Sequence, residues 1–181
     1  MTQTSLRTFV WRSIACQVTT YFVAGWLASS ALGYRDLFGS GAWQHMRSTD
    51  SVWVAAGPTL QCLRGCLFGL VLWPVRGTWL NERHGWARIW ALFVGLAILG
   101  PTAAAPGSLE GVVYTNWSVS DHLLGLPETG TQTLLYCLLF QRWYRHPGRW
   151  WSSLMIGGVI VILCFSALGV LAALYPDAFR P

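Results

Sequence analysis

Five stretches of mainly hydrophobic residues alternate with shorter, more polar connections along the chain. These stretches cover about residues 9–33, 52–74, 86–100, 122–140 and 152–175. Most of them approach the ~20 apolar residues that an α-helix needs to cross ~30 Å of hydrocarbon. The pattern therefore predicts an all-α fold, a multi-pass transmembrane bundle of about five helices. It also predicts one integral membrane domain over residues 1–181.

The five segments differ in polarity. The last is the most apolar, because its run MIGGVIVILCFSALGVLAAL contains no charged residue. The third is short, because Gly100 and Pro101 follow it and proline interrupts a helix. The first is the least hydrophobic. Its polar residues are Gln17, Thr19, Thr20, Ser29 and Ser30.

Composition strengthens the membrane interpretation. Only 10% of the residues are charged and 54% are hydrophobic, whereas a soluble domain usually carries about 25% charged residues. We therefore expect a lipid bilayer around most of the surface. The net charge of +5 could suggest nucleic acid, but the arginines sit at the ends of apolar segments and not in a basic domain. No nucleic-acid partner is predicted.

Arginines are distributed unequally between the two sets of connections. Eight fall at the amino terminus and after the second and fourth segments, namely Arg7, Arg12, Arg76, Arg83, Arg88, Arg142, Arg145 and Arg149. Three fall on the alternate side, namely Arg35, Arg47 and Arg180. Positive residues favour the cytoplasmic side. The bias predicts a bacterial inner (cytoplasmic) membrane protein with its N-terminus inside and its C-terminus outside.

The connection between the third and fourth segments is unusually apolar for a loop. It reads GPTAAAPGSLEGVVYTNWSVSD and contains Pro101, Pro106, Gly107 and Gly111. Proline breaks a helix and glycine permits unusual backbone angles. Residues 101–120 therefore either re-enter the outer leaflet or form a packed external cap, and the sequence leaves both arrangements open.

Two charged residues lie within apolar segments. A charge at the bilayer centre costs about 2.5 to 3.5 kcal/mol and needs a partner, water or a route to the interface. Arg64 lies near the middle of the second segment and Glu128 near the start of the fourth, so we expect them to pair. Gln61 and Gln132 lie one turn from Arg64 and Glu128 respectively and extend the predicted polar network. Glu110 is a possible additional acid.

Such a network can have three roles, and the sequence leaves them open. It can fix helix register without binding anything, form a ligand or ion site, or take part in catalysis. Gly65 and Gly69 form a GxxxG step, with Gly57 on the same stripe. Small residues let helices approach closely, and either internal packing or dimerisation would explain the stripe.

Cofactor and catalytic motifs are lacking. The chain has no phosphate-binding, dinucleotide-binding, zinc-protease or serine-hydrolase motif. Cys62 and Cys66 are one helical turn apart but make an incomplete metal site. We predict no cofactor and no metal. One alternative stays open, in which His122 is the single ligand of a haem or chlorophyll near the outer leaflet.

Three functional classes follow. The favoured one is a non-catalytic membrane component, either a subunit of a larger membrane complex or a homo-oligomer. The second is a small transporter or channel-like protein that binds an ion or anionic solute at Arg64 and Glu128, because intramembrane charges mark pathways. The third is an intramembrane enzyme acting on lipid or peptide through Glu110 and Glu128.

Overall fold

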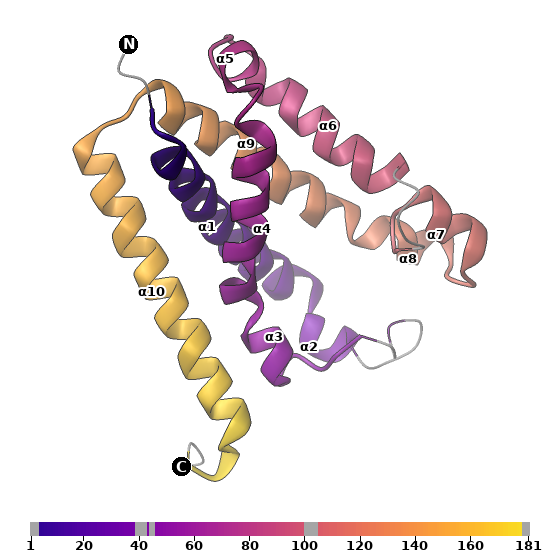
Figure 1. Ribbon diagram of the computed structural model, residues 1–181. Coiled ribbons are helices and arrows are strands. Elements are labelled where there is room, and N and C mark those ends of the chain that lie inside the picture. Colours follow the sequence, from indigo (N-terminus) through magenta and orange to yellow (C-terminus); the bar gives the residue numbers. More distant parts are fainter. Residues whose placement is uncertain (1–3, 39–42, 44–45, 100–104, 179–181) are drawn as a thin grey trace.

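The computed structural model describes residues 4–38, 43, 46–99 and 105–178. All regular secondary structure within these described ranges is helical (Figure 1). The all-α prediction is therefore confirmed. The elements are α1 (Leu6–Leu32), α2 (Tyr34–Leu37), α3 (Val52–Ala55), α4 (Gly57–Leu72), α5 (Arg76–Trp79), α6 (Gly85–Leu99), α7 (Leu109–Tyr114), α8 (Val119–Leu124), α9 (Leu126–Arg145), α10 (Arg149–Leu174) and a 3₁₀ turn at Pro176–Ala178.

Prolines set two of the boundaries that differ from prediction. The second predicted segment is divided into α3 and α4 at Ala56, just before Gly57 and Pro58. The fourth is divided into α8 and α9 at Gly125, two residues before Pro127. A proline restricts the residue ahead of it and is tolerated in the first turn of a helix, so a new helix starts there. The predicted stop at Gly100–Pro101 and the orientation residue Arg180 lie outside the described residues.

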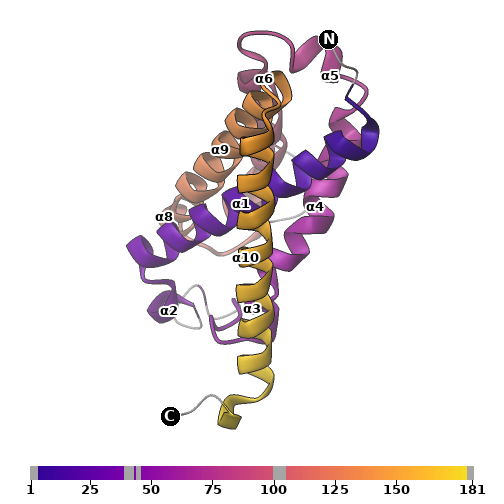
Figure 2. The same ribbon diagram turned by 90° about the vertical axis from the view of Figure 1, so that its left-hand side faces the viewer.

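Helix α1 occupies the centre of the bundle. It contacts α4, α9 and α10, and Figures 1 and 2 show these helices arranged around it. Phe9, Cys16 and Val18 of α1 are fully buried. The least hydrophobic predicted segment is thus the most enclosed one, because its polar side chains find protein partners there.

The glycine stripe of α4 packs against α1. A Cβ atom added to Gly65 would lie 2.6 Å from the Ile14 Cα atom, and one added to Gly69 would lie 3.0 Å from the Val10 Cα atom. Only a residue without a side chain permits this backbone approach. The GxxxG step therefore serves packing inside the chain.

Aromatic rings surround Phe9, near the start of α1. Figure 1 shows the start of α1 at the end of the bundle that also carries α5. Phe9 contacts Phe140, Trp73 and Tyr144 edge to face, with ring centroids 5.0, 5.3 and 5.7 Å apart. Edge-to-face pairs at this spacing are favourable. This cluster closes the N-terminal end of the bundle.

Helix α6 is held against α9 by polar contacts at two levels. The Trp90 indole donates to the Gly130 carbonyl over 3.0 Å. The buried Gln141 side chain donates to the Leu80 carbonyl and accepts from the Trp86 amide, both over 3.0 Å. Gln141 thereby satisfies backbone groups of the α5–α6 connection, which would otherwise lack partners.

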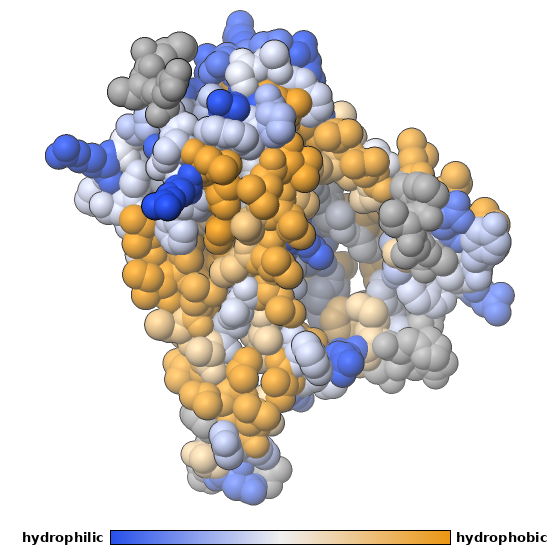
Figure 3. Space-filling view, in the orientation of Figure 1, coloured by the Kyte–Doolittle hydropathy of each residue, from blue (hydrophilic) through white to orange (hydrophobic). Residues whose placement is uncertain are grey.

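One helix among the described residues, α10, is both long and apolar enough to cross a membrane. Helices α4 and α6 are apolar but contain 16 and 15 residues. Helix α1 has 27 residues but is more polar. Apolar side chains cover much of the face shown in Figure 3, while hydrophilic ones gather near α5.

Candidate functional site: an aromatic cavity beside a glutamine relay

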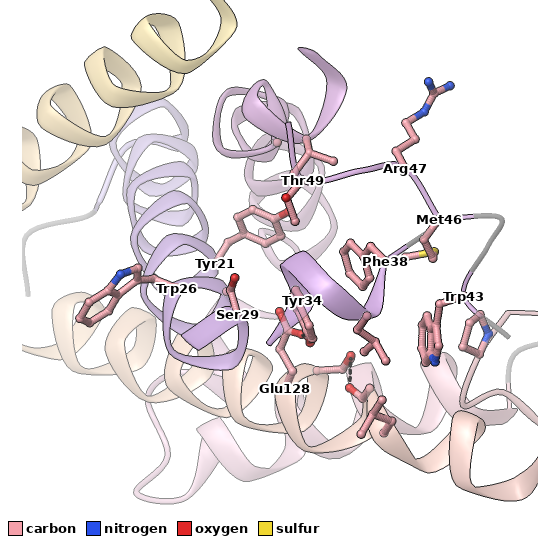
Figure 4. A pocket seen from close by; sticks show the side chains of 18 of the residues that line it. Tyr21, Trp26, Ser29, Tyr34, Phe38, Trp43, Met46, Arg47, Thr49 and Glu128 are labelled. Carbon is pink, nitrogen blue, oxygen red and sulfur yellow. Dashed lines mark hydrogen bonds between the residues drawn. The ribbon is translucent and has the colours of Figure 1, made fainter. Parts of the chain in front are cut away.

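A cavity of about 950 Å³ lies towards the C-terminal end of the bundle. Its walls come from the second half of α1, from α2, from the α3–α4 junction and from the start of α9 (Figure 4). Ligand sites in proteins are clefts of about this size with a few placed polar groups. The polar and charged residues of its wall therefore decide what the cavity can bind.

Glu128 supplies the carboxylate of this cavity. It lies in the first turn of α9 and accepts a hydrogen bond from the Tyr34 hydroxyl. Gly33 positions Tyr34, because its left-handed backbone (φ 61°) ends α1 and turns the chain directly into α2. The amino end of a helix favours negative charge, so an acidic side chain suits the start of α9.

The same contact perturbs Tyr34. Burial, together with the hydrogen bond to Glu128 and its negative charge, raises the pKa of the Tyr34 phenol above its ordinary value. An unfolded chain releases a tyrosine proton near pH 10. Above that pH the unfolded state binds fewer protons than the folded state, so the contribution of Tyr34 to stability falls as pH rises.

This reasoning predicts a pH-dependent difference between the wild type and Tyr34→Phe. The stabilisation that the wild type gains from Tyr34 should be constant below about pH 9 and should shrink above about pH 10. Thermal unfolding at a series of pH values measures it, and the other tyrosines and cysteines cancel in the difference. A difference that stays constant up to pH 11 would contradict the assignment.

Aromatic rings line the part of the cavity beside Glu128. Tyr34 stacks on Phe38 with centroids 4.7 Å apart, Phe38 on Trp43 at 6.3 Å, and Trp43 on Trp117 at 5.9 Å. Tyr21 reaches the cavity from α1 (Figure 4). The faces of such rings carry negative potential and attract cations.

Besides Glu128, the cavity is lined by one other charged residue, Arg47, and its side chain is directed away from Glu128. Figure 4 shows its side chain extending away from Tyr34 and Glu128, and its guanidinium lies 5.7 Å from the centre of the Trp53 ring. The electrostatic character beside Tyr34 is therefore set by one carboxylate and several ring faces. Such a surface suits a positively charged group.

Behind the cavity, three glutamines form a head-to-tail relay across three helices. Gln132 on α9 donates to the Gln17 side-chain oxygen over 3.2 Å, and Gln17 on α1 donates to that of Gln61 on α4 over 3.0 Å. Gln61 lines the cavity, and its own amide lies 3.5 Å from the Gly57 carbonyl. Gln17 and Gln61 each use both the donor and the acceptor of their amides, while Gln132 contributes its donor.

The relay includes two of the predicted network residues, Gln61 and Gln132, but they are joined differently than expected. Gln17 connects them. It is one of the polar residues noted in the first segment, and its position relative to the other two could not be seen without the packing of α1. The sequence signal was the concentration of polar residues in one otherwise apolar segment.

The predicted ion pair between Arg64 and Glu128 is not formed. Arg64 is exposed, and Glu128 bonds to Tyr34 instead. Consecutive helix positions differ by about 100° around the axis. Because Gly65 packs against α1, the neighbouring Arg64 points out of the interface between α1 and α4. Both charges nevertheless lie close enough to Tyr21 to interact with it electrostatically.

Glu110 is separate from this site. It lies in the first turn of α7 and does not belong to the residues that line the cavity. Residues 105–124 contain α7, α8 and a buried Ser108, whose hydroxyl donates to the Ala105 carbonyl over 2.7 Å and accepts from the Gly111 amide over 3.0 Å. Re-entry of residues 101–120 into the outer leaflet and an external cap stay the two alternative predictions.

His122 has a structural role. Its ring is buried, Nδ1 accepts from the Gly107 amide over 3.2 Å, and Nε2 lies 3.4 Å from the Thr115 hydroxyl oxygen. Both nitrogens therefore engage the protein, and this geometry gives no support to a haem or chlorophyll ligand. Within the described ranges, no group of three or more histidine, cysteine, aspartate or glutamate residues could hold a metal.

Arg12, one of the arginines that predict the orientation, is also a buried charge. It is 9% exposed, and its guanidinium lies 5.5 Å from the centre of the Trp143 ring. One guanidinium nitrogen, Nη1, has no hydrogen-bond acceptor within the described structure. A ring face partly replaces the missing acid.

Known proteins offer no guide to what this site does. Comparison of the chain with protein-family models, with curated proteins and with solved structures found no match.

Proposed function

We propose that this chain is a small multi-pass protein of the cytoplasmic membrane, of the transporter class, whose cavity binds a positively charged solute from the outer side. The observation that carries the proposal is Glu128 within an aromatic wall. The second class considered from the sequence binds an ion or anionic solute at Arg64 and Glu128. The proposal narrows that ligand to a cation, because Arg64 does not line the cavity.

Exposed apolar side chains support membrane insertion. Leu63, Val71, Leu96 and Ile160 are each more than half exposed, and soluble monomers rarely expose large contiguous apolar patches. The N-terminus, α5 and the α9–α10 connection lie at one end of the bundle (Figure 1). The arginine-rich connections therefore share a side, as the proposed orientation requires.

The interior supports a site that is accessible from one side. Below the cavity lie the glutamine relay and then the Ser13–Tyr136 hydrogen bond of 2.8 Å. The aromatic cluster around Phe9 follows at the N-terminal end. An outward-facing transporter that is closed on the inner side requires this order of an open cavity followed by a packed interior. A cation bound at Glu128 would lie on the outer side of the packed part.

Binding of an organic cation tests the proposal. Benzyltrimethylammonium is a suitable probe, measured by titration calorimetry on the full chain in lipid nanodiscs. We expect Glu128→Gln to weaken its binding at least about tenfold, which corresponds to ~1.4 kcal/mol, because the variant loses the carboxylate and keeps the rings. Tyr34→Phe keeps the carboxylate and should bind at least as well as the wild type.

Glu110→Gln is the matched control, because it removes the same charge outside the cavity. Its binding should equal that of the wild type. Benzoate and benzyl alcohol have a similar ring with negative and no charge, and neither should bind as well as the cation. Equal affinity of Glu128→Gln and wild type, or a preference for benzoate, would refute the proposal.

The non-catalytic component favoured by the sequence stays a second proposal. Helix α10 favours it: Gly157 and Gly158 lie on surface with nothing within 4 Å of an added Cβ, and small residues are where another helix can approach. Stoichiometric co-purification of another subunit in mild detergent would support this role. The third class gains no support, because Glu110 does not share the cavity of Glu128.

A further inference from the structure

A second groove lies on the other side of α1, between α9 and α10. It encloses about 490 Å³. Its apolar wall is formed by Val23, Leu135, Leu138 and Leu139. Thr19, Thr20, Arg142 and Trp151 complete its lining. Arg142 and Trp151 give the groove a chemistry different from that of the aromatic cavity.

The groove has a polar end, which Arg142 and Trp151 form. Arg142 follows Leu135 by seven residues on α9, which is ~10.5 Å along the helix. Trp151 lies in the first turn of α10, beside the α9–α10 connection. Both residues therefore lie at the N-terminal end of the bundle, while Leu135, Val23 and the two lining threonines, Thr19 and Thr20, lie deeper. In the proposed orientation the polar end faces the inner leaflet.

The polar end contains an unsatisfied donor. The Trp151 indole nitrogen is buried and has no hydrogen-bond acceptor among the residues that the structure describes. A buried indole N–H usually has a partner. The ion pair found among the described residues joins Arg88 to Glu82, and none is found for Arg142. An anionic group from outside the chain would satisfy both this donor and this cation.

We propose that this groove binds an anionic phospholipid of the inner leaflet. One acyl chain lies along Leu135, Leu138 and Leu139. Phosphate oxygens accept from the Trp151 indole and pair with Arg142. Arg149 lies two residues before Trp151 in sequence and adds positive potential, which attracts anionic lipids. The inference rests on the proposed membrane orientation, but it does not depend on what the aromatic cavity binds.

A lipid titration tests this site. The full chain is purified in detergent, and its thermal unfolding is followed while phosphatidylglycerol, diacylglycerol or inorganic phosphate is added. We expect phosphatidylglycerol to raise Tm, diacylglycerol to raise it less because it lacks the phosphate, and inorganic phosphate to have no effect at the same concentration. Native mass spectrometry should detect retained phosphatidylglycerol.

The test variant is Arg142→Gln with Trp151→Phe, which removes the cation and the donor but keeps a polar and an aromatic side chain. The control is Arg145→Gln with Trp150→Phe, in which the tryptophan is 79% exposed and neither residue lines the groove. The lipid-induced rise in Tm should fall by at least half in the test variant and stay unchanged in the control. Leu138→Trp fills the groove without changing its charge and should also reduce the rise.

Equal lipid shifts in test and control variants would overturn the proposal. So would an equal shift with inorganic phosphate, because that would indicate a simple anion site. Neither result bears on cation binding at Glu128, which is measured in the same protein with a different probe. A failure of the membrane orientation would appear separately, as reporter fusions that place Pro147 and Pro106 on the same side.

Discussion

Replacing Gly65 by alanine is expected to lower the free energy of unfolding by about 2 kcal/mol, within the range for overpacked sites, and replacement by leucine should prevent folding. The reason is the contact between α4 and α1. An added Cβ would lie 2.6 Å from the Ile14 Cα atom and 3.0 Å from the Gln17 Cβ atom. The nearer of these atoms is backbone of the central helix, which α9 and α10 hold from other sides. Unfolding in mixed micelles with increasing SDS measures the effect.

Gly158→Ala is the matched control. Gly158 lies within α10, and nothing is within 4 Å of its added Cβ. Alanine is the better helix former by roughly 0.5 to 1 kcal/mol, so this variant should be as stable as the wild type or slightly more stable. If Gly65→Ala were also neutral, the close packing of α1 on α4 would be wrong.

Replacing Gln17 by leucine is expected to lower the free energy of unfolding by about 1 to 3 kcal/mol, the usual penalty for leaving a buried polar partner unsatisfied. Gln17 is the middle member of the relay. Its loss leaves the Gln61 oxygen without its donor and removes one acceptor from the Gln132 amide. Gln132 retains only a longer contact of 3.5 Å to the Thr20 hydroxyl. The same SDS titration measures the change.

A set of leucine variants distinguishes a connected relay from three independent residues. If the amides depend on one another, replacing all three should destabilise the protein by less than the sum of the three single changes, because no unsatisfied partner is then left. Strict additivity would contradict the relay. Hydrogen bonds between membrane helices average about 0.6 kcal/mol, so a loss far above 3 kcal/mol would point to packing.

The change from a predicted ion pair to an amide relay has a simple physical cause. Neutral amides lose less on leaving water than a carboxylate and a guanidinium do. The central contacts of α1 are therefore made by glutamines, and Arg64 lies outside them. Glu128 stays near the end of its helix, where the Tyr34 hydroxyl reaches it.

The sequence by itself determined the helical class, the order of the apolar segments and the unequal distribution of arginines. These properties do not depend on how the helices pack, because hydropathy and local charge can be read residue by residue along the chain. It also identified Gln61, Gln132 and Glu128 as polar residues in apolar surroundings. The predicted helix boundaries differ from the observed ones at Ala56 and Gly125, because new helices start just before Pro58 and Pro127.

Only the tertiary structure decided which polar residues meet. Gln17 connects Gln61 to Gln132 because α1 lies between α4 and α9, and no spacing along the chain indicates that. A step of one position separates Gly65, inside the interface, from Arg64 outside it. The left-handed turn at Gly33 brings Tyr34 to Glu128 across 94 residues of sequence. Contacts between distant segments depend on helix rotation and packing, and those are properties of the assembled bundle.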